Sequence, residues 1–316
     1  MTMVYGNNDG IVVSTNISEK KGTIKYNVNS VILDYMGIIG DAHRSTGHRQ
    51  ISFLDNTKIK SFGNKIGKIF NPGDFGENLT IENINNINLL DTLKINNVIL
   101  KITQLGKTCH GDKCSIYREV GKCLMPIEGF FSQVIVPGKV NVGDFISHDK
   151  YTLKILVITL SDRASKGIYA DTAGAIAKEI LEKFLSNSHW NWEIQQIILP
   201  DNCEKLTLCL KEAINNEVDI IFTLGGTGIS QNDITYECVS SICDKFLPNI
   251  ISNICLKFAN QNPLALLSRS IVGITKKTQI YTLPGSTKAV AEYMQEILKT
   301  MEHIIFMLHS IDNHNI

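Results

Sequence analysis

The chain has 316 residues, of which 43% are hydrophobic and 20% charged, and its 31 Lys and Arg residues balance 31 Asp and Glu residues. This composition is typical of a folded protein and excludes a disordered one. The zero net charge gives no overall indication of binding to nucleic acid or to an anionic membrane. No apolar run approaches the roughly 20 residues of a membrane span, and residues 1–10 lack a signal-peptide core. We therefore expect a cytoplasmic protein of two domains, with no nucleic-acid or membrane partner, whose eight cysteines are mostly reduced.

Short apolar segments separated by turn residues run through the first half of the chain. Gly, Pro and Asn fall between the segments, and one helix fits within residues 52–66. This punctuation is typical of many short strands and predicts a mostly-β, barrel-like domain over residues 1–148. The expected strands are 11–13, 31–33, 51–54, 79–81, 93–95, 98–105, 131–136 and 140–146.

Two polar clusters of this half could carry chemistry. In the first, His43 and Arg49, with Asn78 further along the chain, offer groups that hold an anionic ligand, although solvated loop charge explains them equally well. In the second, Cys109 lies between Lys107 and Lys113, and neighbouring cations favour the thiolate form of a cysteine. A zinc site is the competing interpretation, but the spacing Cys-x4-Cys-x8-Cys lacks a matched second pair.

Four motifs of this half occur in an order that resembles the MOSC domain, named after the C-terminal domain of molybdenum cofactor sulfurases. The resemblance covers roughly residues 10–148 and implies a β-barrel-like fold that binds molybdenum cofactor or a sulfur species. The recurrent cysteine of the family matches Cys109, and the implied site consists of Cys109, His43, Arg49 and Asn78. The motifs are Gly37-Ile-Ile-Gly-Asp-Ala-His43, His48-Arg-Gln50, Pro72-Gly-Asp-Phe-Gly-Glu-Asn-Leu-Thr80 and Thr103-Gln-Leu-Gly-Lys-Thr-Cys-His110.

After the polar linker 147–152 the pattern changes to strands that alternate with helices. Apolar residues at steps of three and four predict the helices, and continuous apolar runs predict buried strands. This alternation predicts a three-layer α/β domain over residues 153–316, with a mainly parallel sheet and helices on both faces. The expected strands are 153–160, 193–199, 219–224 and 279–283, and the expected helices are 172–185, 206–214, 237–244, 250–260 and 286–308.

A glycine loop, Gly225-Gly-Thr-Gly228, follows the third strand of the second half. Glycines at a strand end let the backbone approach a ligand closely, and free backbone N–H groups cradle an anion such as phosphate. Asp233 follows, and a carboxylate beside a phosphate is unfavourable unless a metal cation or a proton lies between them. As a lone motif, the loop is equally well a strand-to-helix turn with Asp233 as its N-cap.

Small, polar or acidic residues follow every strand of this half, and ligands in such sheets bind at the carboxyl ends of the strands. This convergence predicts a site in which Asp201 and Asp233 hold Mg²⁺ between phosphates, while Arg163 and Arg269 neutralise anionic oxygens. Each residue also has a structural interpretation, for example Asp201 as a helix cap or Arg269 as a surface ion pair. The predicted ligand contacts are Ser161, Asp162, Arg163, Gly225, Gly226, Thr227, Gly228, Ser268, Arg269, Pro284, Gly285 and Ser286.

Five motifs of this half resemble the molybdopterin adenylyltransferase family over about residues 153–308. The resemblance implies Mg²⁺-dependent transfer of AMP from ATP to the terminal phosphate of molybdopterin, with release of pyrophosphate. It places the two functional aspartates of the family on Asp201 and Asp233. It also implies a homotrimer through this domain, and protein partners that insert molybdenum or receive the cofactor. The motifs are Ser161-Asp-Arg-Ala-Ser-Lys-Gly-Ile-Tyr-Ala-Asp171, Leu199-Pro-Asp201, Thr223-Leu-Gly-Gly-Thr-Gly228 with Asp233-Ile-Thr235, Leu267-Ser-Arg269 and Leu283-Pro-Gly285.

Two segments depart from the family pattern. Residues 247–255 lack the Gly, Glu and Arg that the family often has there, and Pro284-Gly-Ser-Thr287 differs from the frequent Pro-Gly-x-Pro form and is nearer to a sister branch. These departures favour an alternative, a non-catalytic molybdopterin-binding or carrier protein. The retained Asp201 and Asp233 favour the enzyme.

Overall fold

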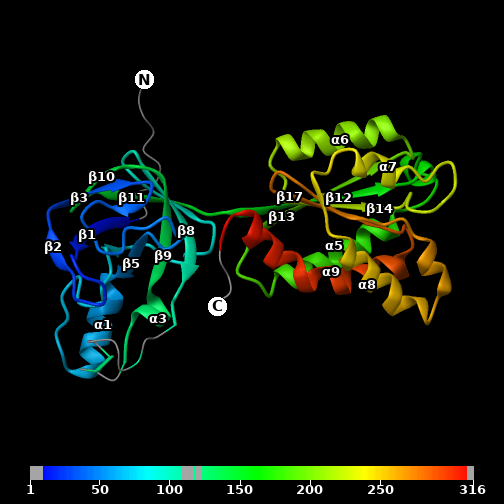
Figure 1. Ribbon diagram of the computed structural model, residues 1–316. Coiled ribbons are helices and arrows are strands. Elements are labelled where there is room, and N and C mark those ends of the chain that lie inside the picture. Colours follow the sequence, from blue (N-terminus) through cyan, green and yellow to red (C-terminus); the bar gives the residue numbers. More distant parts are fainter. Residues whose placement is uncertain (1–9, 109–110, 112–116, 119–121, 312–316) are drawn as a thin grey trace. The chain divides into compact units, whose positions relative to one another are not determined.

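A computed structural model describes residues 10–108, 111, 117–118 and 122–311 of the chain (Figure 1). The chain divides into two compact units, one over Met1–Tyr151 with Ile311–Ile316 and one over Thr152–Ser310. Within the described residues, no helix is both long enough and apolar enough to cross a membrane.

The first unit is built on a sheet that closes on itself. Eight strands run in the order β11-β7-β8-β9-β5-β6-β1-β2, and an additional antiparallel pairing of β11 with β1 closes a barrel, which confirms the expected barrel-like sheet. A smaller sheet has the order β10-β3-β4. The strands are β1 (Gly10–Ile17), β2 (Tyr26–Val28), β3 (Ser30–Asp34), β4 (Gly37–Ile38), β5 (Ile51–Asp55), β6 (Leu79–Glu82), β7 (Thr92–Ile95), β8 (Val98–Leu105), β9 (Phe130–Val136), β10 (Gly138–Asn141) and β11 (Phe145–Asp149).

Side chains that alternate along these strands fill the barrel, because successive residues of a strand point to opposite faces. Val12, Ile51 and Leu93 are fully buried there, and the ring of Phe53 stacks on that of Phe130 with centroids 4.7 Å apart. Helix α1 (Asn56–Ile66) begins where the carboxylate of Asp55 accepts two backbone N–H groups, and a short helix, α3 (Met125–Glu128), precedes β9. The segment 140–146, expected as one strand, divides into β10 and β11 at a turn.

The second unit contains a six-stranded sheet with the order β13-β12-β14-β17-β16-β15. Strands β12, β13, β14 and β17 are mutually parallel, but β16 is antiparallel to both of its neighbours, so the sheet is mixed and not parallel throughout. Only two residues connect β16 to β17, and such a short connection permits only an antiparallel pair. The strands are β12 (Thr152–Leu160), β13 (Asn191–Leu199), β14 (Ile220–Leu224), β15 (Lys245–Phe246), β16 (Val272–Thr275) and β17 (Thr278–Leu283).

Helices cover both faces of this sheet. Figure 1 shows α6 and α7 on one face and α5, α8 and α9 on the other. Leu206 and Leu210 of α6 and Val239 of α7 pack on the sheet residues Ile158 and Ile221 in one buried cluster. The helices are α4 (Asp162–Ser165), α5 (Thr172–Leu185), α6 (Cys203–Asn215), α7 (Thr235–Ser240), α8 (Pro248–Ala259) and α9 (Thr287–Leu308), with a 3-10 turn η2 at Pro263–Leu267.

The described cysteines of the second unit include one disulfide, between Cys203 at the start of α6 and Cys238 in α7. Their Cα atoms lie 5.9 Å apart, within the range that disulfides span. The other described cysteines of this unit are free thiols, namely Cys209, Cys243 and Cys255.

Candidate functional site

The carboxyl ends of the four parallel strands of the second unit meet at one edge of the sheet. Residues that follow each of these strands line a single cavity of about 570 Å³, which we call the aspartate crevice. This is where an open α/β sheet binds its ligands. The lining residues are Thr159, Leu160, Ser161, Asp162, Arg163, Tyr169, Asp171, Thr172, Ala173, Asp201, Leu224, Gly226, Asn232, Asp233, Gly285, Ser286 and Thr287.

Paired backbone contacts join the loops that follow β12 and β13. The N–H of Asp162 donates to Oδ2 of Asp201 over 3.1 Å, and the N–H of Asp201 donates to Oδ1 of Asp162 over 3.2 Å. Burial raises the pKa of Asp201, and the neighbouring carboxylates of Asp162 and Asp233 raise it further, against the hydrogen bond from the Asp162 amide. A bound cation would relieve this concentration of negative charge.

The pKa of Asp233 is shifted in the opposite direction, below its ordinary value. Ser230 donates both its backbone N–H and its hydroxyl to Oδ2 of Asp233, over 2.8 and 2.6 Å. Burial alone would raise the pKa of Asp233, but these bonds and the nearby Arg269 outweigh it and lower that pKa. Asp233 is therefore fixed in place as a carboxylate.

The glycine loop approaches its neighbours too closely for any side chain. Gly225 has φ 104, and a Cβ there would lie 2.7 Å from the backbone oxygen of Leu160. Thr235, the first residue of α7, fastens the loop from the other side, because its hydroxyl donates to Gly225 O over 2.8 Å and its N–H donates to Gly226 O over 3.0 Å. The close approach to the end of β12 thus requires glycine at position 225.

A second cavity of about 330 Å³, the serine crevice, adjoins the first. Gly226, Asp233, Gly285 and Ser286 line both cavities, so ligands in the two would meet at these residues. Burial raises the pKa of the Tyr293 phenol to about 12, so this tyrosine is a neutral hydrogen-bonding group at physiological pH. The other residues of the serine crevice are Thr227, Gly228, Asn262, Leu264, Ala265, Leu267, Ser268, Pro284, Ala289, Glu292 and Tyr293.

Tyr169 is a wall residue of the aspartate crevice that the sequence analysis did not single out. Its hydroxyl lies 2.9 Å from Oγ of Ser161, and the guanidinium of Arg163 stands 5.3 Å from the centre of its ring. Ser161 also caps α4, since its Oγ accepts the N–H of Ala164. Glu292 and Tyr293 of the serine crevice were missed as well, because their spacing within α9 reads only as part of a long amphipathic helix.

Two predicted ligand contacts line neither crevice. Gly225 lies behind the loop, where its N–H donates to Leu283 O over 2.9 Å. Arg269 bonds to the loop itself and lines a different hollow, together with Cys203, Ser230 and Glu237. The structure brings the other predicted residues of the second unit to one or both crevices.

The two aspartates fit a magnesium ion better than a metal that needs a full protein cage. No group of three or more His, Cys, Asp or Glu side chains able to hold a metal occurs in the described part of the chain. Mg²⁺ commonly takes one or two carboxylates and completes its shell with water and substrate phosphates. Asp201, in a carboxylate-rich setting, and Asp233, an oriented carboxylate, are the two groups that would hold such an ion.

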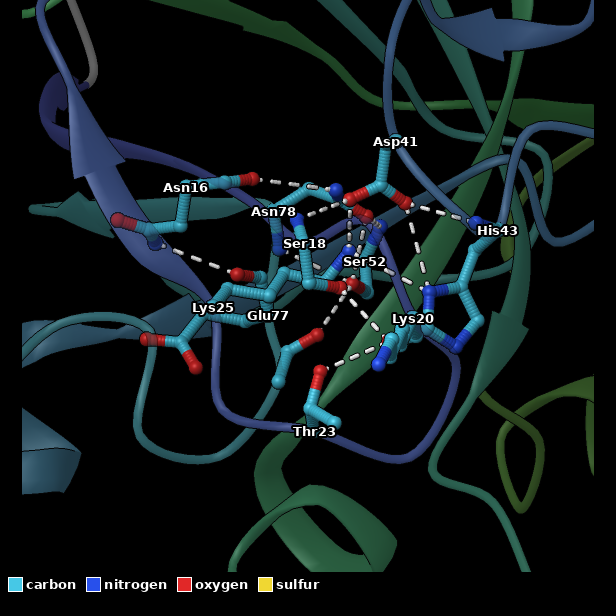
Figure 2. A network of polar contacts seen from close by, with 11 residues as sticks. Asn16, Ser18, Lys20, Thr23, Lys25, Asp41, His43, Ser52, Glu77 and Asn78 are labelled. Carbon is cyan, nitrogen blue, oxygen red and sulfur yellow. Dashed lines mark hydrogen bonds and ion pairs between the residues drawn. The ribbon is translucent and has the colours of Figure 1, made fainter.

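Two of the candidate residues of the first unit, His43 and Asn78, belong to a polar network (Figure 2). Lys25, which the sequence analysis did not single out, forms an ion pair with Asp41 over 2.5 Å, and the two side chains are only 1% and 2% exposed. Asp41 also accepts the backbone N–H groups of Ser18 and His43. The His43 ring lies 3.4 Å from Lys25 Nζ and is 41% exposed, so it connects the buried pair to the surface.

The other predicted residues of this unit fall in three different environments. Asn78 is buried, and its amide bonds to Ser52 and to the backbone oxygen of Asn16, so it joins strands. Arg49 is exposed. Cys109 lies outside the described residues.

The positive charge of Lys107 affects the ionisation of the buried Lys25. Burial lowers the pKa of Lys25, hydrogen bonding and charge from Asp41 oppose this, and the positive charge of Lys107 lowers the pKa further. Lys107 is therefore close enough to the network to influence it.

Comparisons with known proteins divide the chain in the same way. Residues 40–147 match the family model of the MOSC domain, and residues 156–303 match that of a probable molybdopterin binding domain. The molybdopterin adenylyltransferase of Helicobacter pylori is 32% identical over 158 residues, which are 50% of this chain and 88% of that protein. The molybdopterin adenylyltransferase of Pyrococcus furiosus is 30% identical over 158 residues, which are 49% of this chain and 90% of that protein.

Solved structures match over the same half. One described as the anomalous substructure of MogA has 28% identity and a TM-score of 0.46, covering 50% of this chain and 99% of that one. The tungsten cofactor synthesizing protein MoaB from Pyrococcus furiosus has 29% identity and a TM-score of 0.44, covering 51% and 98%. On the strength of the sequence relatives, the chain belongs to the molybdopterin adenylyltransferase family of molybdenum cofactor biosynthesis and carries a MOSC domain ahead of that region.

Proposed function

We propose that the second unit transfers AMP from ATP to the terminal phosphate of molybdopterin and releases pyrophosphate. The observation that carries the proposal is the meeting of Asp201, Asp233 and the glycine loop in one crevice at the carboxyl ends of parallel strands. Membership of the family supplies the identity of the substrates. Retention of both aspartates supports an enzyme over a carrier.

The two crevices suggest how the substrates are arranged. The aspartate crevice suits the triphosphate of ATP, because it contains both carboxylates and the Arg163 cation. The serine crevice suits molybdopterin, since hydroxyl, amide and apolar groups line it beside the carboxylates of Asp233 and Glu292. Ligands bound in both would bring their phosphates together at the shared residues Gly226 and Ser286. Such alignment of two bound reactants is a main source of catalysis in phosphoryl and nucleotidyl transfer.

The chain contributes orientation and charge compensation. Asp201 and Asp233 would hold Mg²⁺, and the bound ion would neutralise charge on the phosphates. Backbone N–H groups of the glycine loop and of the first turn of α9 would bind phosphate oxygens, as helix starts commonly do. Ser286 caps α9, since its Oγ accepts the N–H of Ala289 over 3.3 Å, and this fixes the direction of that turn.

The deciding experiment measures pyrophosphate release from ATP by the purified full chain, with and without molybdopterin. We expect release that requires both molybdopterin and Mg²⁺, and a decrease of about 100-fold or more in Asp233→Asn, as for removal of a principal electrostatic group. Asp244→Asn is the matched control, because Asp244 bonds to Thr275 and Lys276 outside both crevices. Molybdopterin binding without any pyrophosphate release would instead identify a carrier.

For the first unit we propose binding of molybdenum cofactor or of a sulfur species, with Cys109 as the responsible thiol. The MOSC match and the polar network with the solvent-facing His43 support this proposal. The test compares persulfide labelling and pterin-cofactor binding in Cys109→Ser and in Cys123→Ser. If labelling and binding are the same in Cys109→Ser as in the unmodified chain, the role given to this thiol is wrong.

A homotrimer formed through the second unit, suggested by the family resemblance, is also part of the proposal. Sedimentation equilibrium of the full chain measures the mass of the assembly directly. A monomeric mass across the accessible concentration range would refute this part without affecting the proposed reaction.

A further inference from the structure

The guanidinium of Arg269 joins the two ends of the segment that runs from the glycine loop to Asp233. Its Nε donates to the backbone oxygen of Gly228 over 2.7 Å, and its Nη2 donates to the backbone oxygen of Asp233 over 2.7 Å. Its own backbone N–H donates to Thr227 O over 2.8 Å. One side chain thus connects the glycine loop to the backbone of Asp233.

The charge of Arg269 is compensated within the protein. Its Nη1 bonds to the carboxylate of Glu237 in α7, and this hydrogen bond lowers the pKa of Glu237. The guanidinium also stands 5.5 Å from the centre of the Tyr236 ring. All three nitrogens of the group are therefore engaged with protein atoms.

Arg269 is not among the residues that line the two crevices. It lines instead a neighbouring hollow whose wall includes Glu237, Ser230 and the shared residue Asp233. An arginine that bound a triphosphate would need to point its fork at the phosphate oxygens. In this structure the fork of Arg269 is directed at the protein atoms of Gly228, Asp233 and Glu237.

We propose that Arg269 and Glu237 form a positioning pair that sets the distance between the glycine loop and Asp233. Glu237 orients the guanidinium from α7, and the guanidinium in turn holds the two carbonyl groups. The expected effect of this pair on turnover rests on the proposed adenylyl transfer. Its expected effect on the conformation of the glycine loop does not. This positioning role differs from the anion-binding role that the sequence predicts for Arg269.

Two substitutions separate a positioning role from an anion-binding role. Arg269→Lys keeps the positive charge but cannot make three bonds from one planar fork. Glu237→Gln keeps nearly the same shape but frees the arginine from its counterion. If Arg269 bound ATP, the lysine would preserve much of the affinity for ATP, and Glu237→Gln would raise that affinity. If Arg269 positions the loop, both variants lose function.

The first experiment follows amide hydrogen exchange in the ligand-free full chain. The informative amides are those of Ser230, which bonds to the Asp233 carboxylate, and of Thr235, which bonds to Gly226 O. We expect these amides to exchange about 10- to 100-fold faster in Arg269→Lys and in Glu237→Gln, as loss of charge-assisted hydrogen bonds implies. Lys257→Met, which removes a different ion pair of this unit, with Glu296, should leave them unchanged. Unchanged exchange in both pair variants would overturn the proposal.

The second experiment measures steady-state kinetics of pyrophosphate release as a function of ATP and of Mg²⁺. We expect Arg269→Lys and Arg269→Met to lower kcat to a similar extent, with a smaller change in the KM for ATP, and to require more Mg²⁺ for half-maximal rate. An increase in ATP affinity in Glu237→Gln would contradict the proposal and restore the anion-binding role. If the unmodified chain released no pyrophosphate, the adenylyl-transfer proposal would fail, and the exchange experiment would still decide the role of the pair.

Discussion

Asp162 and Asp201 each accept a hydrogen bond from the backbone N–H of the other. The reciprocal pair locks the loop after β12 to the loop after β13, although 39 residues separate the two positions along the chain. One of these aspartates is a proposed magnesium ligand, and the other fixes its backbone. The placement of Asp201 therefore depends on an acidic neighbour that also disfavours its ionisation.

The reciprocal pair can be tested with two substitutions of Asp162. Asp162→Ala removes the acceptor for the Asp201 N–H, so we expect adenylyl transfer to fall about 10- to 100-fold, the equivalent of one lost hydrogen bond to a charged group. Asp162→Asn keeps an oxygen acceptor and removes the repelling charge, so its rate should remain near that of the unmodified chain. Equal losses in the two variants, measured as pyrophosphate release, would show that the charge of Asp162 matters and not the bond.

The close approach of Gly225 to β12 predicts a large cost for any side chain there. In Gly225→Ala the new Cβ would meet Leu160 O at 2.7 Å with φ at 104, and we expect the free energy of unfolding of the second unit to fall by about 2–6 kcal/mol. Gly167→Ala is the matched control, because Gly167 also has a positive φ but meets nothing within 4 Å. That variant should cost only about 1–2 kcal/mol. Urea denaturation followed by tryptophan fluorescence reports on this unit, and equal losses would contradict the steric explanation.

Replacement of Lys25, a buried cation of the first unit, should lower the stability of that unit. Lys25→Met leaves the carboxylate of Asp41 buried without its counterion, so we expect the free energy of unfolding of this unit to fall by about 3–5 kcal/mol. Arg44→Met is the control, because Arg44 pairs with Asp34 at a partly exposed position, where solvent screens the pair and its loss should cost much less. Hydrogen exchange of backbone amides in the barrel strands measures the loss of stability in both variants. A loss in Lys25→Met no larger than that in Arg44→Met would show that Asp41 is satisfied without the lysine.

The buried carboxyl group of Glu77 should make the stability of the first unit depend on pH. Its Oε2 is buried without a hydrogen-bond partner in the described structure, and burial raises its pKa above the ordinary value of 4.5. Below pH 4.5 the carboxyl group is protonated in both folded and unfolded chains, so it contributes no pH dependence. As the pH rises from 4.5 towards the raised pKa, the unfolded chain ionises first, and the first unit loses stability.

Glu77→Gln should remove this loss, because the amide cannot ionise and keeps the oxygen that accepts from Gly73 and Thr80. We expect the variant to be more stable than the unmodified chain at pH 7 and similar to it near pH 4. The lowered pKa of Asp41 acts in a different window, since its stabilisation is lost only as the pH falls below the ordinary value of 3.8. Urea denaturation from pH 4 to pH 7 measures the difference, and parallel curves would refute the assignment to Glu77.

The cross-link between Cys203 and Cys238 should contribute to the stability of the second unit. It closes a loop with a sequence separation of 35, and disulfides typically stabilise by about 2–4 kcal/mol. We expect Cys203→Ser to lower the free energy of unfolding by that amount under oxidising conditions, and dithiothreitol to bring the unmodified chain to the same value. Cys209→Ser removes a free thiol and keeps the cross-link, so dithiothreitol should lower its free energy of unfolding by the same amount as in the unmodified chain.

The sequence predicts regular elements well where their pattern is long. Residues 172–185 were expected as a helix and form α5, and the apolar run 98–105 forms β8. The run Val272–Thr275 was not expected as a strand, because it has four residues and a central glycine, and this strand makes the sheet mixed. Short strands of this kind are defined by their partners in the sheet more than by their own residues.

Site residues divide in a similar way. The order of strands and loops predicts that polar residues converge, because carboxyl ends of parallel strands share one edge. It does not predict the direction of a long side chain, and Arg269 turns to the loop and not to the crevice. Lys25 could not be singled out, since its importance depends on burial beside Asp41, which lies 16 positions away along the chain.

The disulfide lies immediately downstream of both proposed magnesium ligands. Cys203 comes two positions after Asp201, and Cys238 five positions after Asp233. The two helices that carry these cysteines are tethered covalently, so the side of the crevice that bears the aspartates behaves as one body. In the proposed reaction, any widening that admits molybdopterin or releases pyrophosphate would then come from the opposite rim, where the turn at Gly285 leads into α9.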